Sequence, residues 1–168
     1  AGICYNFTAL NATNVSFNVS SWTEYKIGTG CGVLNQANRV YTLENDIITT
    51  GTCFTIAADN VTLDGQGFSI VGDGEAGDHG VRVNALNFTL RNLSIDTFDY
   101  GIFLSGFGNS RILKNQVYNS SRGIFLSSSA NNTIENNNFL FNSEGVVLIS
   151  SLVINNSFVN NSINHSRS

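Results

Sequence analysis

The chain has 168 residues, a formal net charge of −4, and only 12% charged residues against 42% hydrophobic ones. This length fits one domain with a buried core, and the apolar content excludes disorder caused by a shortage of apolar side chains. The basic residues are scattered, which argues against a nucleic-acid partner, and no apolar run reaches the ~18 residues of a membrane span. Proline is absent, as suits a chain whose backbone N–H groups mostly donate to strand ladders.

Residues 1–30 are expected to form an N-terminal arm outside the repeat described below. Apolar and polar residues alternate over residues 3–7 and again over residues 15–19, and each alternation predicts a strand with one apolar face. The chain starts at Ala1 and contains no methionine, which indicates a mature secreted product; a trimmed cytosolic protein is the alternative.

The three cysteines are Cys4, Cys31 and Cys53. A secreted chain with three cysteines is expected to form one disulfide and leave one thiol over. We favour Cys31–Cys53, because both lie near the start of the repeat, which leaves Cys4 free or paired with another chain. The competing pair, Cys4–Cys31, would tie down the N-terminal arm.

From about residue 31 onward the sequence repeats with a step of 22 residues. Gly-Ile-Phe-Leu-Ser at 101–105 returns at 123–127 and, in looser form, at 145–149. Each unit contains short alternating stretches separated by turns, without the 3.6-residue period of a helix. A second motif, two apolar residues five positions apart, recurs at 90–95, 112–117 and 134–139, and again after a step of only 19 residues at 153–158.

This pattern predicts an all-β fold, a right-handed parallel β-helix of about six coils of ~22 residues over 31–168. One such unit cannot close its own core, so successive copies must stack. The Leu-x-x-Leu-x-Leu frame of a leucine-rich repeat is absent, and a β-sandwich would not keep a constant spacing.

Asparagine is abundant, and part of it falls at equivalent positions of the repeat. Asn115, Asn137 and Asn156 are expected to form one column at a turn, with Leu93 in the preceding copy. Stacked asparagine side chains can hydrogen-bond along the axis and satisfy buried turn backbone. Much of the asparagine therefore has a structural explanation.

The stretch from Cys31 to Gly72 contains Tyr41-Thr42-Leu43, then Gly-Thr-Cys-Phe-Thr-Ile at 51–56 and Asp-Asn-Val-Thr-Leu-Asp-Gly-Gln-Gly at 59–67. It resembles the opening of secreted prokaryotic parallel β-helix proteins of the carbohydrate-binding and sugar-hydrolase type, also described as NosD-like repeats. The resemblance extends over most of 31–168. It implies the fold, but such repeats occur in lyases, hydrolases, epimerases and non-enzymatic surface proteins.

Sequons of the form Asn-x-Ser/Thr exceed the number expected by chance, which predicts N-glycosylation. Turns that favour Asn, Ser and Thr are the competing explanation, which is strongest for Asn60, Asn87 and Asn131 before strands and weakest in the arm. The expected glycosylation sites are Asn6, Asn11, Asn14, Asn18, Asn92, Asn119, Asn155, Asn160 and Asn164.

A glycine-rich acidic loop at 72–80 is the longest insertion in the repeat. Asp73, Glu75 and Asp78 could offer oxygen ligands to Ca²⁺, although their spacing does not match an EF-hand. A solvated loop without metal is the favoured interpretation, and no cofactor is expected.

Alignment of the repeat also predicts a possible catalytic face. It places Asp78 beside Asp99 on the next coil, close to His79 and Arg122. Paired carboxylates are needed for glycoside hydrolysis. The alternative is an exposed column in which Arg122 pairs with Glu144, and the sequence lacks the motifs of known polygalacturonases. We therefore favour a non-enzymatic role.

The repeat runs nearly to the last residue without a visible cap. We expect an N-glycosylated structural protein of the extracellular space or cell surface, whose copies associate head to tail into a filament or coat. The alternatives are that residues 1–30 cap their own chain, giving a monomer, or that the face around Asp78, His79 and Asp99 binds or cleaves glycans.

Overall fold

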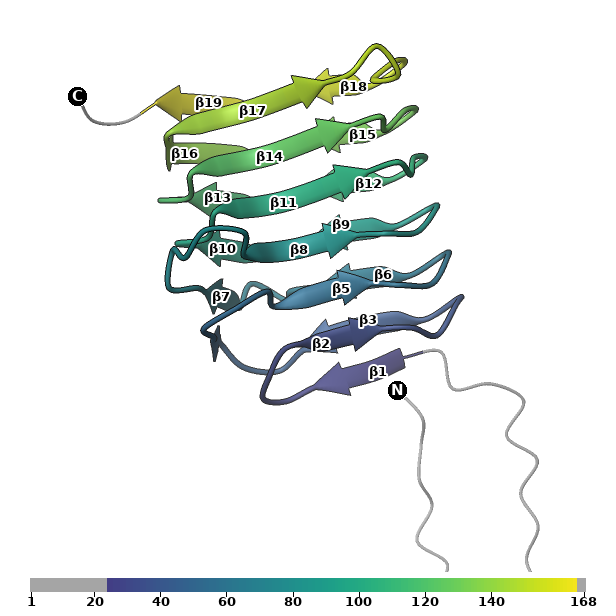
Figure 1. The fold of residues 1–168 in the computed structure, drawn as a ribbon. Coiled ribbons are helices and arrows are strands. Elements are labelled where there is room, and N and C mark those ends of the chain that lie inside the picture. Colours follow the sequence, from purple (N-terminus) through teal and green to yellow (C-terminus); the bar gives the residue numbers. More distant parts are fainter. Residues whose placement is uncertain (1–23, 166–168) are drawn as a thin grey trace, which may run out of the picture.

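A computed structural model of the chain describes residues 24–165, which form a parallel β-helix. Figure 1 shows the coils stacked from β1 at one end to β17, β18 and β19 at the other. The described residues form strands and turns without any helix, so the predicted fold class is confirmed.

Three parallel sheets run along the axis, and each coil adds one strand to each of them. Sheet A contains β1 (Glu24–Ile27), β3 (Val40–Leu43), β6 (Thr62–Asp64), β9 (Thr89–Arg91), β12 (Arg111–Leu113), β15 (Thr133–Glu135) and β18 (Ser157–Val159). Sheet B contains β2 (Gly32–Leu34), β5 (Phe54–Ile56), β8 (His79–Val83), β11 (Tyr100–Ser105), β14 (Arg122–Ser127) and β17 (Glu144–Ile149). Sheet C contains β4 (Ile47–Ile48), β7 (Ser69–Val71), β10 (Ser94–Asp96), β13 (Gln116–Tyr118), β16 (Asn138–Asn142) and β19 (Ser162–His165).

Side chains alternate between core and surface along most strands in the middle of the stack. In sheet C, Ile70, Ile95 and Val117 are register partners on successive coils, and all three are fully buried. Burying one such side chain contributes roughly 1.5–3 kcal/mol. Columns of this kind from all three sheets hold the coils together along the axis.

The chain turns at corners where one residue has a left-handed backbone. Asn60, Asn87 and Asn131 mark the corner before sheet A on three coils, with φ of 58°, 56° and 58°. Asparagine visits this region more readily than most residues, because its short side chain can hydrogen-bond locally. The next residue points inward and the one after it starts a strand with an outward Ser or Thr, so the corner itself generates the sequon pattern. Asn92, Asn119, Asn155 and Asn160 also have positive φ.

Asparagine side chains form hydrogen-bonded ladders along the axis. The backbone N–H and Nδ2 of Asn115 both donate to Oδ1 of Asn137, at 2.9 and 3.0 Å. Asn137 Nδ2 donates in turn to the Ile112 carbonyl at 2.7 Å. The next member is Asn161, whose Oδ1 accepts from the backbone N–H and Nδ2 of Asn137, both at 3.0 Å.

The predicted third member of this ladder, Asn156, belongs to a neighbouring one. Its Oδ1 accepts from the backbone N–H and Nδ2 of Asn132, at 2.9 and 2.8 Å. The 19-residue step expected for the last coil is therefore wrong. Ile134 pairs with Phe158, 24 residues further on (158 − 134), because the turn between β17 and β18 is longer than its counterparts.

A disulfide joins Cys31 to Cys53, which precede β2 and β5 on adjacent coils, with their Cα atoms 4.5 Å apart. Cys4 lies outside the described residues. Within the predicted arm, residues 24–27 form β1 and pair in parallel with β3, while the expected strands at 3–7 and 15–19 lie outside the described part of the chain.

Candidate functional site

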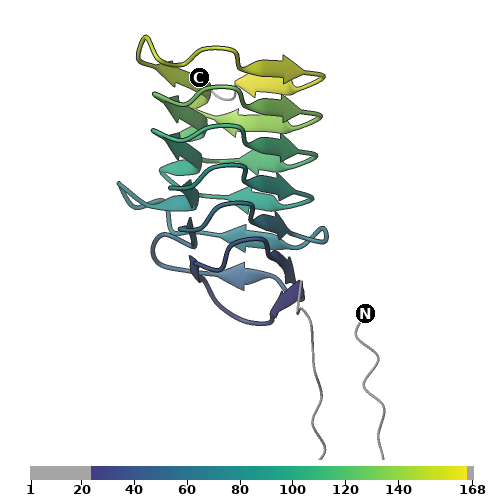
Figure 2. The same cartoon turned by 90° about the vertical axis from the view of Figure 1, so that its right-hand side faces the viewer.

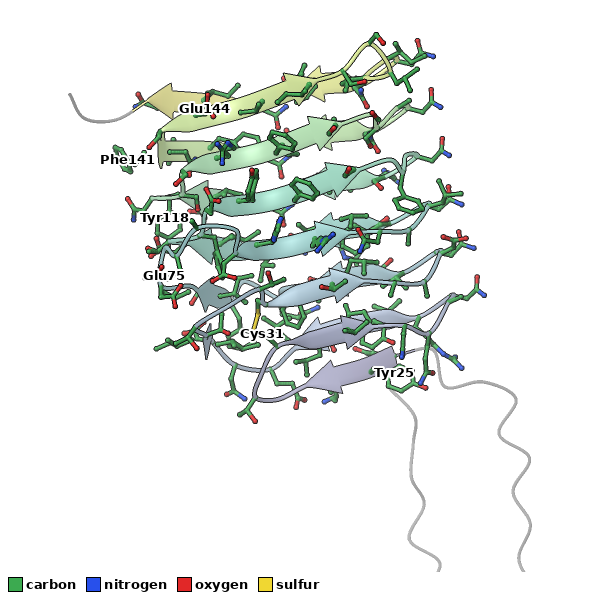
Figure 3. The ribbon with its side chains drawn as sticks, viewed as in Figure 1. Tyr25, Cys31, Glu75, Tyr118, Phe141 and Glu144 are labelled. Atoms are coloured by element: carbon green, nitrogen blue, oxygen red, sulfur yellow. A yellow bond between two sulfur atoms is a disulfide. The ribbon has the colours of Figure 1, made fainter. Side chains whose placement is uncertain are left out.

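The outer face of sheet B carries an aromatic cluster formed by His79, Tyr100, Phe103 and Phe125. Phe103 and Phe125 are register partners in β11 and β14, and their rings stack with centroids 5.2 Å apart. The ring of Tyr100 meets both phenylalanine rings edge-on at 5.2 Å. Alternation along β11 and β14 sends Phe103 and Phe125 outward. Sheet B faces the viewer in Figure 3.

His79, Tyr100 and Arg122 form a second stack beside the phenylalanines. They are register partners in β8, β11 and β14. The His79 and Tyr100 rings stack with centroids 5.0 Å apart, and the Arg122 guanidinium lies 4.7 Å from the Tyr100 centroid on a neighbouring coil. A cation over an aromatic ring contributes about 0.5–2 kcal/mol, depending on its exposure.

Arg122 is also the centre of a charge network. Its Nη1 lies 3.0 Å from Oδ1 of Asp99, and its Nε lies 3.2 Å from Oε2 of Glu144. The second oxygen of Asp99 accepts the Gly77 N–H at 2.8 Å. Both carboxylate oxygens of Asp99 therefore have partners inside the protein, and Figure 3 labels Glu144 near the start of β17.

The ring of His79 is largely enclosed by its neighbours. Its Nδ1 lies 3.3 Å from the Thr52 hydroxyl. Burial lowers the pKa of His79, the positive charge of Arg82 lowers it further, and the negative charges of Asp99 and Asp78 oppose this. The neutral imidazole is consequently favoured in the folded protein.

The structure brings His79, Asp99 and Arg122 of the predicted catalytic group together. Asp78 joins them through its backbone carbonyl, which accepts the Tyr100 N–H at 2.9 Å, and through its charge, which acts on His79. Glycoside hydrolysis needs one carboxylate to protonate a leaving group and another to attack or to activate water. Both oxygens of Asp99 are already engaged, by Arg122 and by the Gly77 N–H, so neither role is open to Asp99 without breaking one of these contacts.

Phe103 and Phe125 were not among the predicted site residues. They lie in the middle of the repeated Gly-Ile-Phe-Leu-Ser motif, where three consecutive apolar residues suggest that all of them are buried. The available signal was alternation, because the residues on either side of each phenylalanine are buried and so the phenylalanine itself faces outward.

The acidic loop does not gather a metal site. Asp73 accepts the backbone N–H of Glu75 at 3.2 Å, which is an ordinary turn contact. Among the described residues no group of three or more His, Cys, Asp or Glu side chains could hold a metal ion, so Asp73, Glu75 and Asp78 are not assembled as ligands.

The coil of β17, β18 and β19 forms an open end, and no described residue stacks on it (Figure 2). Leu148, Phe158 and Ile163 point inward there but are 51%, 37% and 50% exposed. Their partners one coil below, Leu126, Ile134 and Phe139, are fully buried. A shallow depression at this end is lined by Val146, Leu148, Phe158, Asn160, Asn161 and Ile163.

A family model described as "Periplasmic copper-binding protein (NosD)" matches residues 5–168. No curated protein and no solved structure is significantly similar to the chain. In the part of the chain that the structure describes, no helix is long and apolar enough to span a membrane.

No set of side chains among the described residues 24–165 fits a copper site. Copper in proteins is held mainly by cysteine, methionine and histidine side chains. The chain has no methionine and two histidines. Cys31 and Cys53 are joined in the disulfide, and the His79 ring is stacked and buried, so we derive no function through copper.

Proposed function

The chain belongs to the NosD family, and from this premise we propose that it is a structural β-helix protein, located outside the cytoplasm, whose copies associate head to tail into a filament or surface coat. The family description, which names periplasmic proteins, supports the location. The Cys31–Cys53 disulfide also supports it, because disulfides persist in oxidising compartments and are rare in the cytosol.

One observation carries the assembly proposal: the inward side chains of the last described coil are exposed. Leu148 and Ile163 hold the positions that belong to the core in every preceding coil, yet about half of each is accessible. The outer edges of β17, β18 and β19 also have no strand beside them among the described residues. Exposed strand edges over an apolar surface favour pairing with another chain.

Association through this end is directional. One copy offers the coil of β17, β18 and β19, and the next offers the opposite end of the stack. A contact between two different surfaces, repeated without closure, produces an open filament instead of a closed oligomer. Head-to-tail stacking also keeps the parallel direction of all three sheets from one copy to the next.

Sedimentation and negative-stain electron microscopy of the native full-length chain test this proposal. We expect filaments that Leu148→Asp converts to monomers, because it places a charge on the apolar end. Leu86→Asp is the matched control, since Leu86 is 40% exposed on a turn in the middle of the stack. Monomers at every concentration of the native chain would overturn the proposal, as would equal effects of the two variants.

The proposal includes N-glycans on exposed asparagines. Asn119 and Asn155 are exposed at corners of the stack, so each could accept a glycan without disturbing the core. Asn6, Asn11, Asn14 and Asn18 lie outside the described residues. Intact mass of the native protein before and after enzymatic removal of N-glycans tests this part: we expect a decrease, and an unchanged mass overturns it.

A second candidate function, glycan binding without catalysis, is favoured by the outer face of sheet B. Half-exposed Phe103 lies between the exposed Arg82 on one neighbouring coil and half-exposed Phe125 on the other, and rings flanked by hydrogen-bonding groups suit the apolar faces and hydroxyls of sugars. Affinity electrophoresis in gels containing neutral or acidic polysaccharides should show retardation that Phe103→Ala combined with Phe125→Ala abolishes. Phe107→Ala, on an exposed turn, is the control; retardation that survives the double variant excludes this face.

A further inference from the structure

The three sheets do not end at the same level of the stack. Among the described residues, sheet A has seven strands, whereas sheets B and C have six each. At one end the chain passes from β1 in sheet A straight to β2 in sheet B, without a strand in sheet C. At the other end β18 and β19 follow β17, the last described strand of sheet B. Sheet A therefore projects by one strand beyond sheet C at the β1 end and beyond sheet B at the β18 end.

These strand numbers restrict how two copies can stack head to tail along one axis. Two strands cannot occupy one position, so the seven strands of sheet A set the shortest repeat at seven spacings, about 34 Å at ~4.8 Å per spacing. At this repeat β1 of one copy lies beside β18 of the next. Direct pairing of β2 with β17, or of β4 with β19, requires a repeat of six spacings and would place β1 and β18 at the same position.

We infer that β1 of one copy pairs in parallel with β18 of the next, and that this pair is the strand-to-strand contact of the assembly. The inference rests on the proposed head-to-tail association and identifies the strands and the register that make it. Register partners on every coil of sheet A connect Glu24 in β1 to Ser157 in β18, so both belong to one column. Continuing this column across the junction places Glu24 beside Ser157 and Tyr25 beside Phe158.

The inward side chains at the two ends suit this pairing. Tyr25 and Phe158 are the first and last described members of one inward column of sheet A. The members between them are all buried, namely Tyr41, Leu63, Leu90, Ile112 and Ile134. Phe158 is 37% exposed, and Tyr25 is half-buried, with its ring stacked on Tyr41 at 5.3 Å. Contact between Tyr25 and Phe158 buries apolar surface on both copies.

The β1 end suits β18 better than a second β18 end does. Outward, Glu24 and Lys26 of β1 lie beside the neutral Ser157 and Val159, so no like charges face each other across the junction. A contact between two β18 ends would make these strands antiparallel and close the assembly as a dimer. It would also leave Tyr25 at both outer ends of that dimer, whereas head-to-tail pairing covers both ends of the column.

Site-directed crosslinking of the full chain tests this register. In a Cys4→Ser background, chains carrying Glu24→Cys are mixed with chains carrying Ser157→Cys and oxidised. Neighbouring strands lie ~4.8 Å apart, which is within the Cα separation that a disulfide spans. We expect a disulfide between the two chains that forms at least about tenfold faster than between Val33→Cys and Val147→Cys.

Val33 and Val147 are the matched control pair. They are the outward residues at the two ends of one column of sheet B. At the inferred repeat they lie two spacings apart across the junction, about 10 Å at ~4.8 Å per spacing, which is too far for a disulfide.

The axial repeat of the filaments is a second readout, and it needs no variant. Electron micrographs of native filaments should show a repeat of about 34 Å per copy, which is seven spacings of ~4.8 Å. Filaments with a different repeat, or equal crosslinking at the two pairs, overturn the register between β1 and β18 but leave head-to-tail assembly standing. Monomers at every concentration overturn both, and so do closed dimers in which two Ser157→Cys chains crosslink to each other.

Discussion

Leu148 lies directly beside Leu126 in sheet B, yet Leu126 is fully buried whereas half of Leu148 is exposed. The two leucines occupy the same position on adjacent coils, so the difference comes only from what stacks on each. Leu126→Ala should lower the free energy of unfolding by about 2–5 kcal/mol, as for other core leucines. Leu148→Ala should lower it by about 1 kcal/mol or less in dilute protein, since less contact is lost.

Urea denaturation at low protein concentration checks this pair. The same measurement at high protein concentration gives a second readout. Assembly should bury Leu148, so Leu148→Ala should then lower the free energy of unfolding by more than it does in dilute protein. Equal losses for the two variants in dilute protein would mean that Leu148 is covered within a single chain.

The Asn137 side chain is a structural element of the core. Its amide joins Asn115, Asn161 and the Ile112 carbonyl inside the stack. Asn137→Ala leaves the buried N–H of Asn115 and the buried carbonyl of Ile112 without the hydrogen bonds that Asn137 supplies. Each unsatisfied buried group costs about 1–3 kcal/mol. We expect a loss of about 3 kcal/mol by urea denaturation. Asn138→Ala, which changes the adjacent outward side chain, should cost less than about 0.5 kcal/mol.

The sequence was sufficient to predict the coil architecture, because a constant 22-residue step forces equivalent residues into columns. It was not sufficient to predict the last coil. There the turn after Ile149 is longer than in the preceding coils. Alignment of the apolar residues therefore paired Ile134 with Val153, whereas its partner in the structure is Phe158. Asn156 consequently entered the wrong ladder. The hydrogen bonds distinguish the two ladders, whereas the sequence presents asparagine at both positions.

The predicted face was located more accurately than its chemistry. The register placed His79, Tyr100, Arg122 and Glu144 on one column, as the pairing of β8, β11, β14 and β17 requires. The alignment could not predict the side-chain partners. Asp99 lies in the turn before β11 and contacts Arg122 with its side chain, whereas the register partner of Arg122 in β11 is Tyr100. Its double engagement is what weakens the catalytic interpretation.

Thr97 occupies a corner that suits asparagine better. Its φ is 59°, and Asn119 holds the equivalent corner one coil later with φ 52°. A left-handed backbone is particularly unfavourable for a β-branched residue. Thr97→Asn should raise the free energy of unfolding by about 1 kcal/mol, and Asn119→Thr should lower it by a similar amount. Thermal or urea unfolding of both variants checks the expectation; changes of the same sign would contradict it.

His79 should make stability depend on pH. Its pKa in the folded protein lies below the ordinary value of 6.5, mainly because of burial and then because of Arg82. The unfolded chain therefore binds a proton at higher pH than the folded one, so the contribution of His79 is present above about pH 6.5 and is lost as pH falls through the folded pKa. Urea denaturation should show that the free energy of unfolding falls less between pH 7.5 and pH 5 for His79→Gln than for the native chain. Arg82→Ala should raise the His79 pKa, measurable by NMR titration. If the native chain and His79→Gln lose the same stability on acidification, the histidine has no part in it.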